Sequence, residues 1–266
     1  MSGIYFVEPG YVPGPVNPVT GKNYEHGWIC LRLTDEAEYE VFCSGRELYC
    51  AAISKQNPGW KYRVMDFVEY SLKQGKDVIF SGDRADYEAA RKAYAGHHHK
   101  DRTLRPHELR VMVHSATPDG YPSIVRMGAL KSRKLLIQEG VISEKKPSIG
   151  RKLCAPEDFE DYVMLGYNDV DGELVVASKQ LGRIEANADV PYKPGARFYF
   201  DAEAIALDGL LVRDGLHLKV EKKLPLAAYL LWTATPENVD PDETEWTPRK
   251  FAEKADKSFE AWFGEV

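Results

Sequence analysis

The residues best suited to chemistry lie in one stretch near the middle of the chain. His114, Ser115 and Thr117 follow an apolar run, and Arg133 comes a few residues further on. An imidazole, two hydroxyls and a guanidinium can orient hydroxyl groups and hold phosphate oxygens by hydrogen bonds. The stretch therefore predicts a binding site for an anionic or dinucleotide ligand.

A strand, a polar turn and a short helix must position these side chains. Apolar residues alternate over 109–113 and predict a strand that carries His114 out of its end. Apolar residues at 124–127 predict a short amphipathic helix, and Gly128 predicts the end of that helix.

The second half of the chain shows mainly hairpin signals. The turn residues Asp169–Gly172 predict a hairpin leading into a strand at 173–178. Further strands are predicted at 197–201, 210–213 and 216–220, the last two joined around Asp214-Gly215, and an amphipathic helix is predicted at 248–263.

The sequence pattern of the first half predicts two parts, an arm and an α+β region. Residues 1–27 are rich in proline and glycine, which predicts an extended arm without regular structure. Residues 28–103 predict an N-terminal α+β region with strands near 28–33, 39–43 and 77–81 and helices at 62–73 and 83–94. The polar run His97–Arg102 predicts a boundary, so the third part is residues 104–266.

The spacing of these elements decides the fold class. Strands and short helices alternate without the regular spacing of βαβ units, which favours a mixed α+β fold over a doubly wound parallel sheet. We therefore expect an N-terminal α+β extension followed by a domain with a mixed or antiparallel sheet and a C-terminal helix.

Composition favours an ordinary globular protein over a membrane protein or a protein with a generally basic surface. The chain has 266 residues, a formal net charge of -6 and 44% hydrophobic residues, which is ordinary for a globular protein. An acidic surface attracts nucleic acid only through a local basic patch. Neither a signal peptide nor an apolar run of about 20 residues is visible, so an intracellular, cytoplasmic protein without membrane contact is expected. The four cysteines are expected to be reduced thiols, although a Cys43–Cys50 bridge stays open.

The order of elements over about residues 105–235 resembles the ADP-ribosyltransferase superfamily, especially its RNA 2′-phosphotransferase and DarT-type DNA-modifying branches. The resemblance is carried by the turn His114-Ser115-Ala116-Thr117, then Ser123-Ile124, Gly128-Ala129-Leu130 and Arg133, and downstream by Asp201-Ala202, Asp208-Gly209 and Leu224-Pro225. The turn has one residue more than the family pattern, and Arg133 is not followed by the second histidine that follows the corresponding arginine in the phosphotransferases.

The resemblance implies NAD⁺ as co-substrate and an ADP-ribosyltransferase-like fold for 104–266. It implies that His114 and Thr117 orient the ribose, that Arg133 contacts the phosphates, and that Ser115, Gly128 and His217 also line the NAD⁺ site. His114, Arg133 and Glu221 are the expected catalytic residues, with Glu221 as the carboxylate that stabilises the cation or activates the acceptor. Glu243-Thr244-Glu245 is the other candidate for that carboxylate.

Three functions follow as hypotheses. The first is transfer of ADP-ribose from NAD⁺ to a nucleic acid or a small acceptor. The second is the NAD⁺-dependent removal of a 2′-phosphate from RNA. The third is a non-catalytic module that binds a nucleotide or a protein through a decayed site.

Each candidate residue also has a purely structural interpretation. His114 could be a satisfied histidine at a strand end, Arg133 a solvated surface charge, and Glu221 an exposed partner of the lysines that follow it. No metal site is predicted, because the adjacent histidines His97–His99 point in different directions and rarely close one coordination sphere.

Overall fold

The computed structural model describes residues 2–25, 27–36, 40–44, 48–97, 102–145, 158–167 and 169–264, with the backbone alone for 40–44. The chain forms two compact units, which we describe separately. The N-terminal unit contains the described residues up to Glu108 together with Val212–Leu218. The C-terminal unit contains the other described residues from Leu109 onward.

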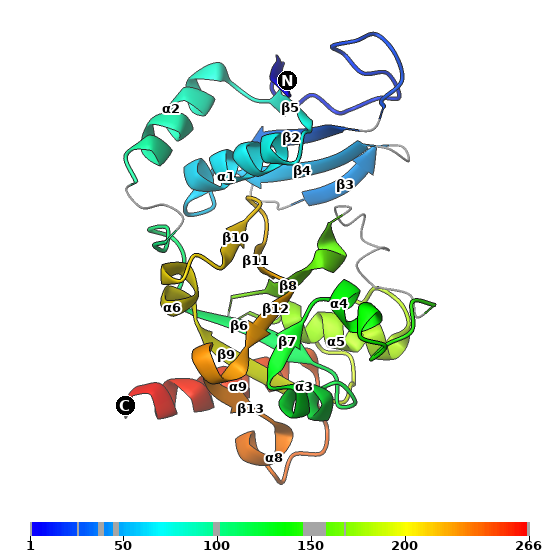
Figure 1. Ribbon diagram of the computed structural model, residues 1–266, viewed down its shortest axis with the longest axis vertical. Helices are drawn as coiled ribbons and strands as arrows, with labels where there is room; N and C mark the ends of the chain where they lie inside the picture. The colour runs from blue at the N-terminus through cyan, green and yellow to red at the C-terminus, as the bar shows by residue number, and fades with distance from the viewer. Residues whose placement is uncertain are drawn as a thin grey trace. The chain divides into compact units, whose positions relative to one another are not determined.

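A five-stranded sheet organises the N-terminal unit (Figure 1). Its strand order is β1 (Ile4–Val7), β5 (Asp77–Ser81), β2 (Trp28–Thr34), β4 (Leu48–Ser54) and β3 (Glu40–Ser44). The first four strands are parallel to their neighbours, and β3 alone runs antiparallel to β4. The chain is a mixed α+β protein as expected, but this unit has a mainly parallel sheet that the sequence pattern did not indicate.

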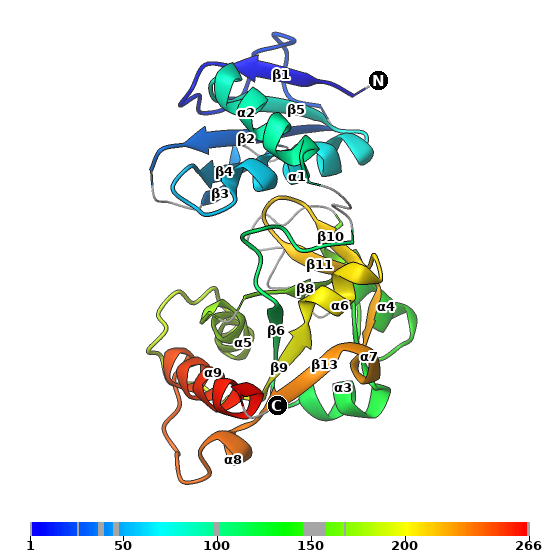
Figure 2. The ribbon, with the colours of Figure 1, turned by 90° about the vertical axis from the view of Figure 1, so that its left-hand side faces the viewer.

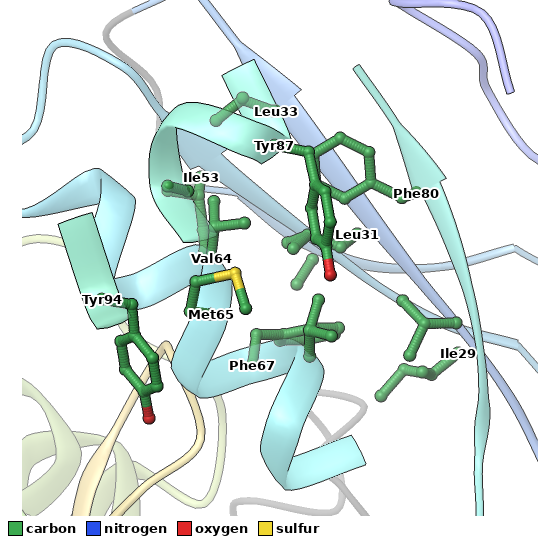
Figure 3. Packing of buried hydrophobic residues seen from close by; sticks show 14 residues of the cluster. Ile29, Leu31, Leu33, Ile53, Val64, Met65, Phe67, Phe80, Tyr87 and Tyr94 are labelled. Carbon is green, nitrogen blue, oxygen red and sulfur yellow. The ribbon is translucent and has the colours of Figure 1, made fainter. Parts of the chain in front are cut away.

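Two helices cover one face of that sheet. α1 (Trp60–Lys73) and α2 (Arg84–Ala95) pack on alternate residues of β2 such as Leu31, as Figure 3 shows for the core around Phe67 and Phe80. The helix at 62–73 was predicted because apolar residues recur at helical spacing, and it begins two residues earlier than expected. Asp83 precedes α2 as predicted, although its side chain makes no cap hydrogen bond.

The proline-rich arm covers the opposite face. Cys30 and Cys50 lie on neighbouring strands with their side chains in a second cluster, where Tyr24 of the arm packs against them. Both cysteines are buried free thiols, which excludes the Cys43–Cys50 bridge. The expectation that residues 1–27 lack regular structure was wrong for β1, because Ile4–Val7 complete the sheet edge beside β5. The prolines are confined to the segment after this strand.

The N-terminal unit contains two buried ion pairs. The Arg105 guanidinium donates to both carboxylate oxygens of Asp66, at 2.8 and 3.3 Å. Arg213, from the segment that returns to this unit, donates to both oxygens of Glu108 at 2.6 and 2.7 Å. Because all four side chains are nearly inaccessible to solvent, each charge depends on its partner.

The C-terminal unit is built around a small antiparallel sheet ordered β13 (Leu230–Ala234), β9 (Ala196–Asp201) and β6 (Val111–Ala116). α5 (Asp171–Leu181) and α9 (Pro248–Gly264) pack on one face, and α3 (Tyr121–Met127) lies on the other (Figure 2). The other described elements after residue 108 are β7 (Ala129–Lys131), α4 (Arg133–Gln138), η2 (Phe159–Asp161), β8 (Tyr162–Leu165), α6 (Ala202–Leu207), β10 (Leu211–Arg213), β11 (Leu218–Glu221), β12 (Lys223–Pro225), α7 (Leu226–Tyr229) and α8 (Pro236–Val239). Most of β10 and the first residue of β11 fall in the segment Val212–Leu218 that belongs to the N-terminal unit.

Several local predictions for the second half of the chain are confirmed. The strand at 197–201 is β9, the hairpin around Asp214-Gly215 joins β10 to β11, and the C-terminal helix is α9. β12 pairs with β7, and β11 lies between β10 and β8.

The predicted strand at 173–178 was wrong, because these residues belong to α5. Glu173, Val176 and Ala177 are fully buried at spacings of three and four residues, which is one face of a helix. Gly182 ends this helix in the left-handed conformation with φ 66°. The valines favoured a strand locally, but burial of this face against β6 and α9 decides the structure.

No described helix has the length and apolar character needed to cross a bilayer. The boundary predicted at His97–Arg102 includes residues 98–101, which lie outside the described residues.

Candidate functional site

His114 is held by the strand that carries it. β6 pairs antiparallel with β9 so that His114 lies opposite Phe198, on the face away from α5 and α9. The Nδ1 atom lies 2.9 Å from the carbonyl oxygen of Met164 on β8. Because a carbonyl only accepts hydrogen bonds, Nδ1 carries the proton and donates it.

The environment keeps this imidazole neutral. Burial lowers the pKa of His114 to about 4, with a further lowering from the Lys179 ammonium, and the Met164 hydrogen bond acts in the opposite direction. In a neutral ring with the proton on Nδ1, Nε2 is a hydrogen-bond acceptor. Among the described residues, the only hydrogen bond of the His114 ring is the one from Nδ1 to Met164. His114 therefore offers one acceptor atom to a donor such as a hydroxyl group.

Ser115 and Thr117 have different roles from each other. Ser115 points to the opposite face of β6, where its buried hydroxyl donates to Glu173 at 2.5 Å. Its expected place beside His114 in a ligand site is therefore wrong, because neighbouring residues on a strand face opposite ways. Thr117 Oγ1 accepts from the backbone N–H of Gly120 at 3.2 Å and stabilises the turn before α3. The Thr117 hydroxyl still has a proton to donate.

Gly128 has a structural reason to be glycine. It ends α3 with φ 62°, a left-handed conformation that costs other residues about 1–2 kcal/mol. Its carbonyl also accepts from the backbone N–H of Leu226 at 2.9 Å. Gly128 thus ends α3, as the sequence predicted, and the chain continues into β7.

Arg133 begins α4 and is already engaged. Ser132 caps this helix by accepting from the Leu135 N–H, which fixes the backbone from which Arg133 projects. The Arg133 Nε donates to Glu160 Oε1 at 3.1 Å, and another guanidinium nitrogen donates to the Glu144 carbonyl at 3.4 Å. A phosphate group would have to compete with these acceptors.

Each of the two remaining predicted residues already has a partner close to it in the sequence. Glu221 ends β11 with its carboxylate largely exposed and 3.0 Å from the Lys222 ammonium. His217 belongs to the segment that folds with the N-terminal unit, where its Nδ1 lies 3.2 Å from Asp214 Oδ2. Asp214 also accepts from the His217 backbone N–H, so this pair forms a local turn.

Sequence reasoning missed a buried polar network behind β6. Arg197 is fully buried, and it binds Asp256 of α9 through Nε at 3.0 Å and the Asp169 carbonyl at 2.9 Å. Its other terminal nitrogen lies 3.6 Å from Glu173 Oε1. Burial raises the pKa of Glu173, and Arg197 acts in the opposite direction.

Two tyrosines complete this network. Tyr192 donates to Glu173 at 2.9 Å, and Tyr199 donates to Asp256 at 2.7 Å. One sequence signal was available: Arg197 stands inside the apolar strand RFYFD, and a charge buried in a strand needs a partner. Its partners come from α5 and α9, so only the tertiary fold reveals them.

Among the described residues, no group of three or more His, Cys, Asp or Glu side chains could hold a metal ion. His97 Nε2 instead lies 3.1 Å from the Thr103 hydroxyl, and His107 stacks on Tyr62. His98 and His99 lie outside the described part of the chain.

Comparison with known proteins identifies no relative: no family model, curated protein or solved structure matches the chain.

The histidines make stability depend on pH. Burial lowers the pKa of both His107 and His114 from 6.5 to about 4, so the unfolded chain binds these protons at a higher pH than the folded chain. Stability from each histidine is therefore fully present above about pH 6.5 and is lost as the pH falls toward 4, by at most about 3 kcal/mol each. Urea denaturation at pH 7.5 and at pH 4.5 measures how much free energy of unfolding is lost between these two pH values. This loss is expected to be smaller for His107→Gln and for His114→Gln than for the unchanged chain. Equal losses in all three would contradict the burial of neutral imidazoles.

Proposed function

We propose that the C-terminal unit binds NAD⁺ along β6 and transfers its ADP-ribose to an acceptor, either a nucleic acid or a small molecule. The observation that supports the proposal is the neutral His114, whose Nε2 is an acceptor that takes no hydrogen bond from another described residue. A ribose hydroxyl is a donor that matches this atom. The ADP-ribosyltransferase-like arrangement of residues 104–266 is part of the same proposal.

The chain's residues act mainly by positioning. His114 accepts from one ribose hydroxyl, and Thr117 donates its hydroxyl proton to the same ligand. Arg133 contacts the phosphates after exchanging its bond with Glu160. NAD⁺ supplies a labile bond between nicotinamide and ribose, and cleavage of that bond develops positive charge on the ribose. Fixed groups that hold the ribose and the phosphates favour such a state because they need no reorganisation.

Not every expected residue fits this ligand. Ser115 is bound to Glu173 on the other face of β6, and His217 is bound to Asp214. Glu221 takes part only if its carboxylate leaves the ion pair with Lys222. We therefore keep His114, Thr117 and Arg133 as the binding set and Glu221 as the proposed carboxylate.

The position of Glu221 also favours a second candidate function. A carboxylate that acts on the ribose cation must approach it closely, but Glu221 is exposed and paired with Lys222. A module that binds a nucleotide without cleaving it needs only the positioning groups. NAD⁺ binding without nicotinamide release would support this second function.

Replacing His114 by Ala is expected to reduce nicotinamide release from NAD⁺ by about 100-fold, because the ribose loses a fixed acceptor. Release would be measured by chromatography, with single-stranded DNA, RNA or a cell lysate as the source of acceptor. His97→Ala is the matched control, since this histidine belongs to the N-terminal unit and is expected to leave release unchanged. Loss of the Met164 hydrogen bond should lower stability by only about 1 kcal/mol.

The same samples distinguish the two functions. If calorimetry shows that NAD⁺ binds but no mixture releases nicotinamide, the protein is a nucleotide-binding module and not a transferase. Absence of both binding and release would exclude both functions.

A further inference from the structure

A short acidic segment lies against the cations of α4. We call Asp158–Asp161 the acidic strap; it contains η2 and leads directly into β8. Glu160 accepts from Arg133 Nε at 3.1 Å, and Asp161 Oδ1 lies 2.6 Å from the Lys134 ammonium. Two consecutive acidic residues therefore match two consecutive basic residues of α4.

The third carboxylate of the strap follows the same pattern. Asp158 lies 3.6 Å from the ammonium of Lys219, a β11 residue whose side chain is only 1% exposed. The Lys219 ammonium also lies 4.3 Å from the centre of the Tyr162 ring. Every carboxylate of the strap thus lies near a cation from α4 or β11.

We infer that the acidic strap occupies an anion site formed by Arg133, Lys134 and Lys219, and that a diphosphate group binds there by displacing the strap. The inference rests on the proposed function for the role of Arg133, and it adds Lys134 and Lys219 as diphosphate contacts. Three cations from two elements suit a ligand with several anionic oxygens, because each ammonium or guanidinium can meet a different oxygen.

The contacts permit such an exchange. The side chains of Arg133 and Glu160 are each 18% exposed, and those of Lys134 and Asp161 are 58% and 35% exposed. Ion pairs that water can reach contribute little to stability, so a ligand of higher charge can replace the pairs of Arg133 and Lys134. Lys219 is buried beside Asp158 and reaches the ligand once Asp158 has moved. The backbone carbonyl of Asp161 accepts from the Lys222 N–H at 2.9 Å, which anchors this end of the strap while Asp158–Glu160 move.

Inorganic pyrophosphate is the probe, because it tests the site without NAD⁺. Calorimetry on the full chain is expected to show that E160Q/D161N binds pyrophosphate about threefold to tenfold more tightly than the unchanged protein, since two competing carboxylates are gone. E203Q/D189N is the matched control, because it removes two acidic charges from exposed ion pairs elsewhere in the unit. Arg133→Met in the E160Q/D161N background should weaken binding at least tenfold.

Hydrogen exchange measures whether the acidic strap moves when the ligand binds. In the unchanged protein, saturating pyrophosphate should speed hydrogen exchange at the Asp161 amide, which donates to the Asp158 carbonyl at 2.8 Å. The inference is overturned if E160Q/D161N binds no more tightly than E203Q/D189N, if none of the proteins binds pyrophosphate, or if strap exchange does not change. If the protein releases nicotinamide but fails these tests, the proposed function stands and only the inference about the acidic strap is rejected. If the protein passes these tests without releasing nicotinamide, the anion site stands and the proposed ADP-ribose transfer is rejected.

Discussion

Arg197→Met is expected to lower the free energy of unfolding of the C-terminal unit by about 3–5 kcal/mol, the cost of leaving buried charges without their partner. Arg197 and Glu173 are both 0% exposed, and Arg197 also binds Asp256. Methionine fills a similar volume but leaves the Glu173 and Asp256 carboxylates without a cation beside them. Urea denaturation of the full chain, followed by hydrogen exchange in β9, measures this loss.

The matched control is Arg183→Met. Arg183 also pairs with a glutamate, at 2.9 Å from Glu185, but its side chain is 69% exposed. This change is expected to cost less than about 1 kcal/mol. Neutralising the acids as well, in R197M/E173Q/D256N, should recover part of the loss, because no buried charge then remains. Equal stability of R197M and R183M would show that the buried network does not stabilise the unit.

Gly195→Ala is expected to cost about 3 kcal/mol or more, because the added methyl group would overlap backbone rather than a movable side chain. An ideal Cβ on Gly195 would lie 2.3 Å from the Ala116 carbonyl oxygen and 2.4 Å from the Thr117 carbonyl carbon. The segment before β9 therefore contacts the turn that follows β6. No described residue lies within 4 Å of the corresponding position on Gly264, so Gly264→Ala should change stability by less than about 0.5 kcal/mol.

Gly195→Ala should also affect ligand binding. To accommodate the methyl group, the turn after β6 has to move, and this turn includes Thr117. A thermal scan of both glycine variants, followed by NAD⁺ titration of each folded protein, measures the two effects. A Gly195→Ala protein as stable as the Gly264→Ala protein would show that the contact between the two segments is loose.

Local sequence signals predicted the elements whose cues lie within a few residues. The strand before His114, the helix ended by Gly128 and the hairpin at Asp214-Gly215 all have such cues. α5 was missed because its valines favour a strand, and its helical face becomes clear only when Glu173 is seen to be buried. β1 was missed because the prolines after it dominated the composition of the first 27 residues.

The candidate site was predictable in its residues but not in their partners. A histidine leaving a strand was visible, but the bond from its Nδ1 to Met164 spans 50 residues. Arg133 was read as a phosphate contact without Glu160, which is 27 residues away. Such pairs have no periodicity, so only the folded chain shows which atoms of a candidate residue are already engaged.

The return of Val212–Leu218 to the N-terminal unit has a consequence for how this protein can be divided. A chain that stops after Glu108 would contain every strand of the N-terminal sheet but would lack Arg213. The Glu108 carboxylate, 2% exposed, would then be buried without the guanidinium that neutralises it. Genetic truncation or exchange of the first 108 residues would therefore break an ion pair that spans more than 100 positions of sequence. The two units form separate cores, but cutting the chain between them after Glu108 is expected to destabilise the N-terminal unit.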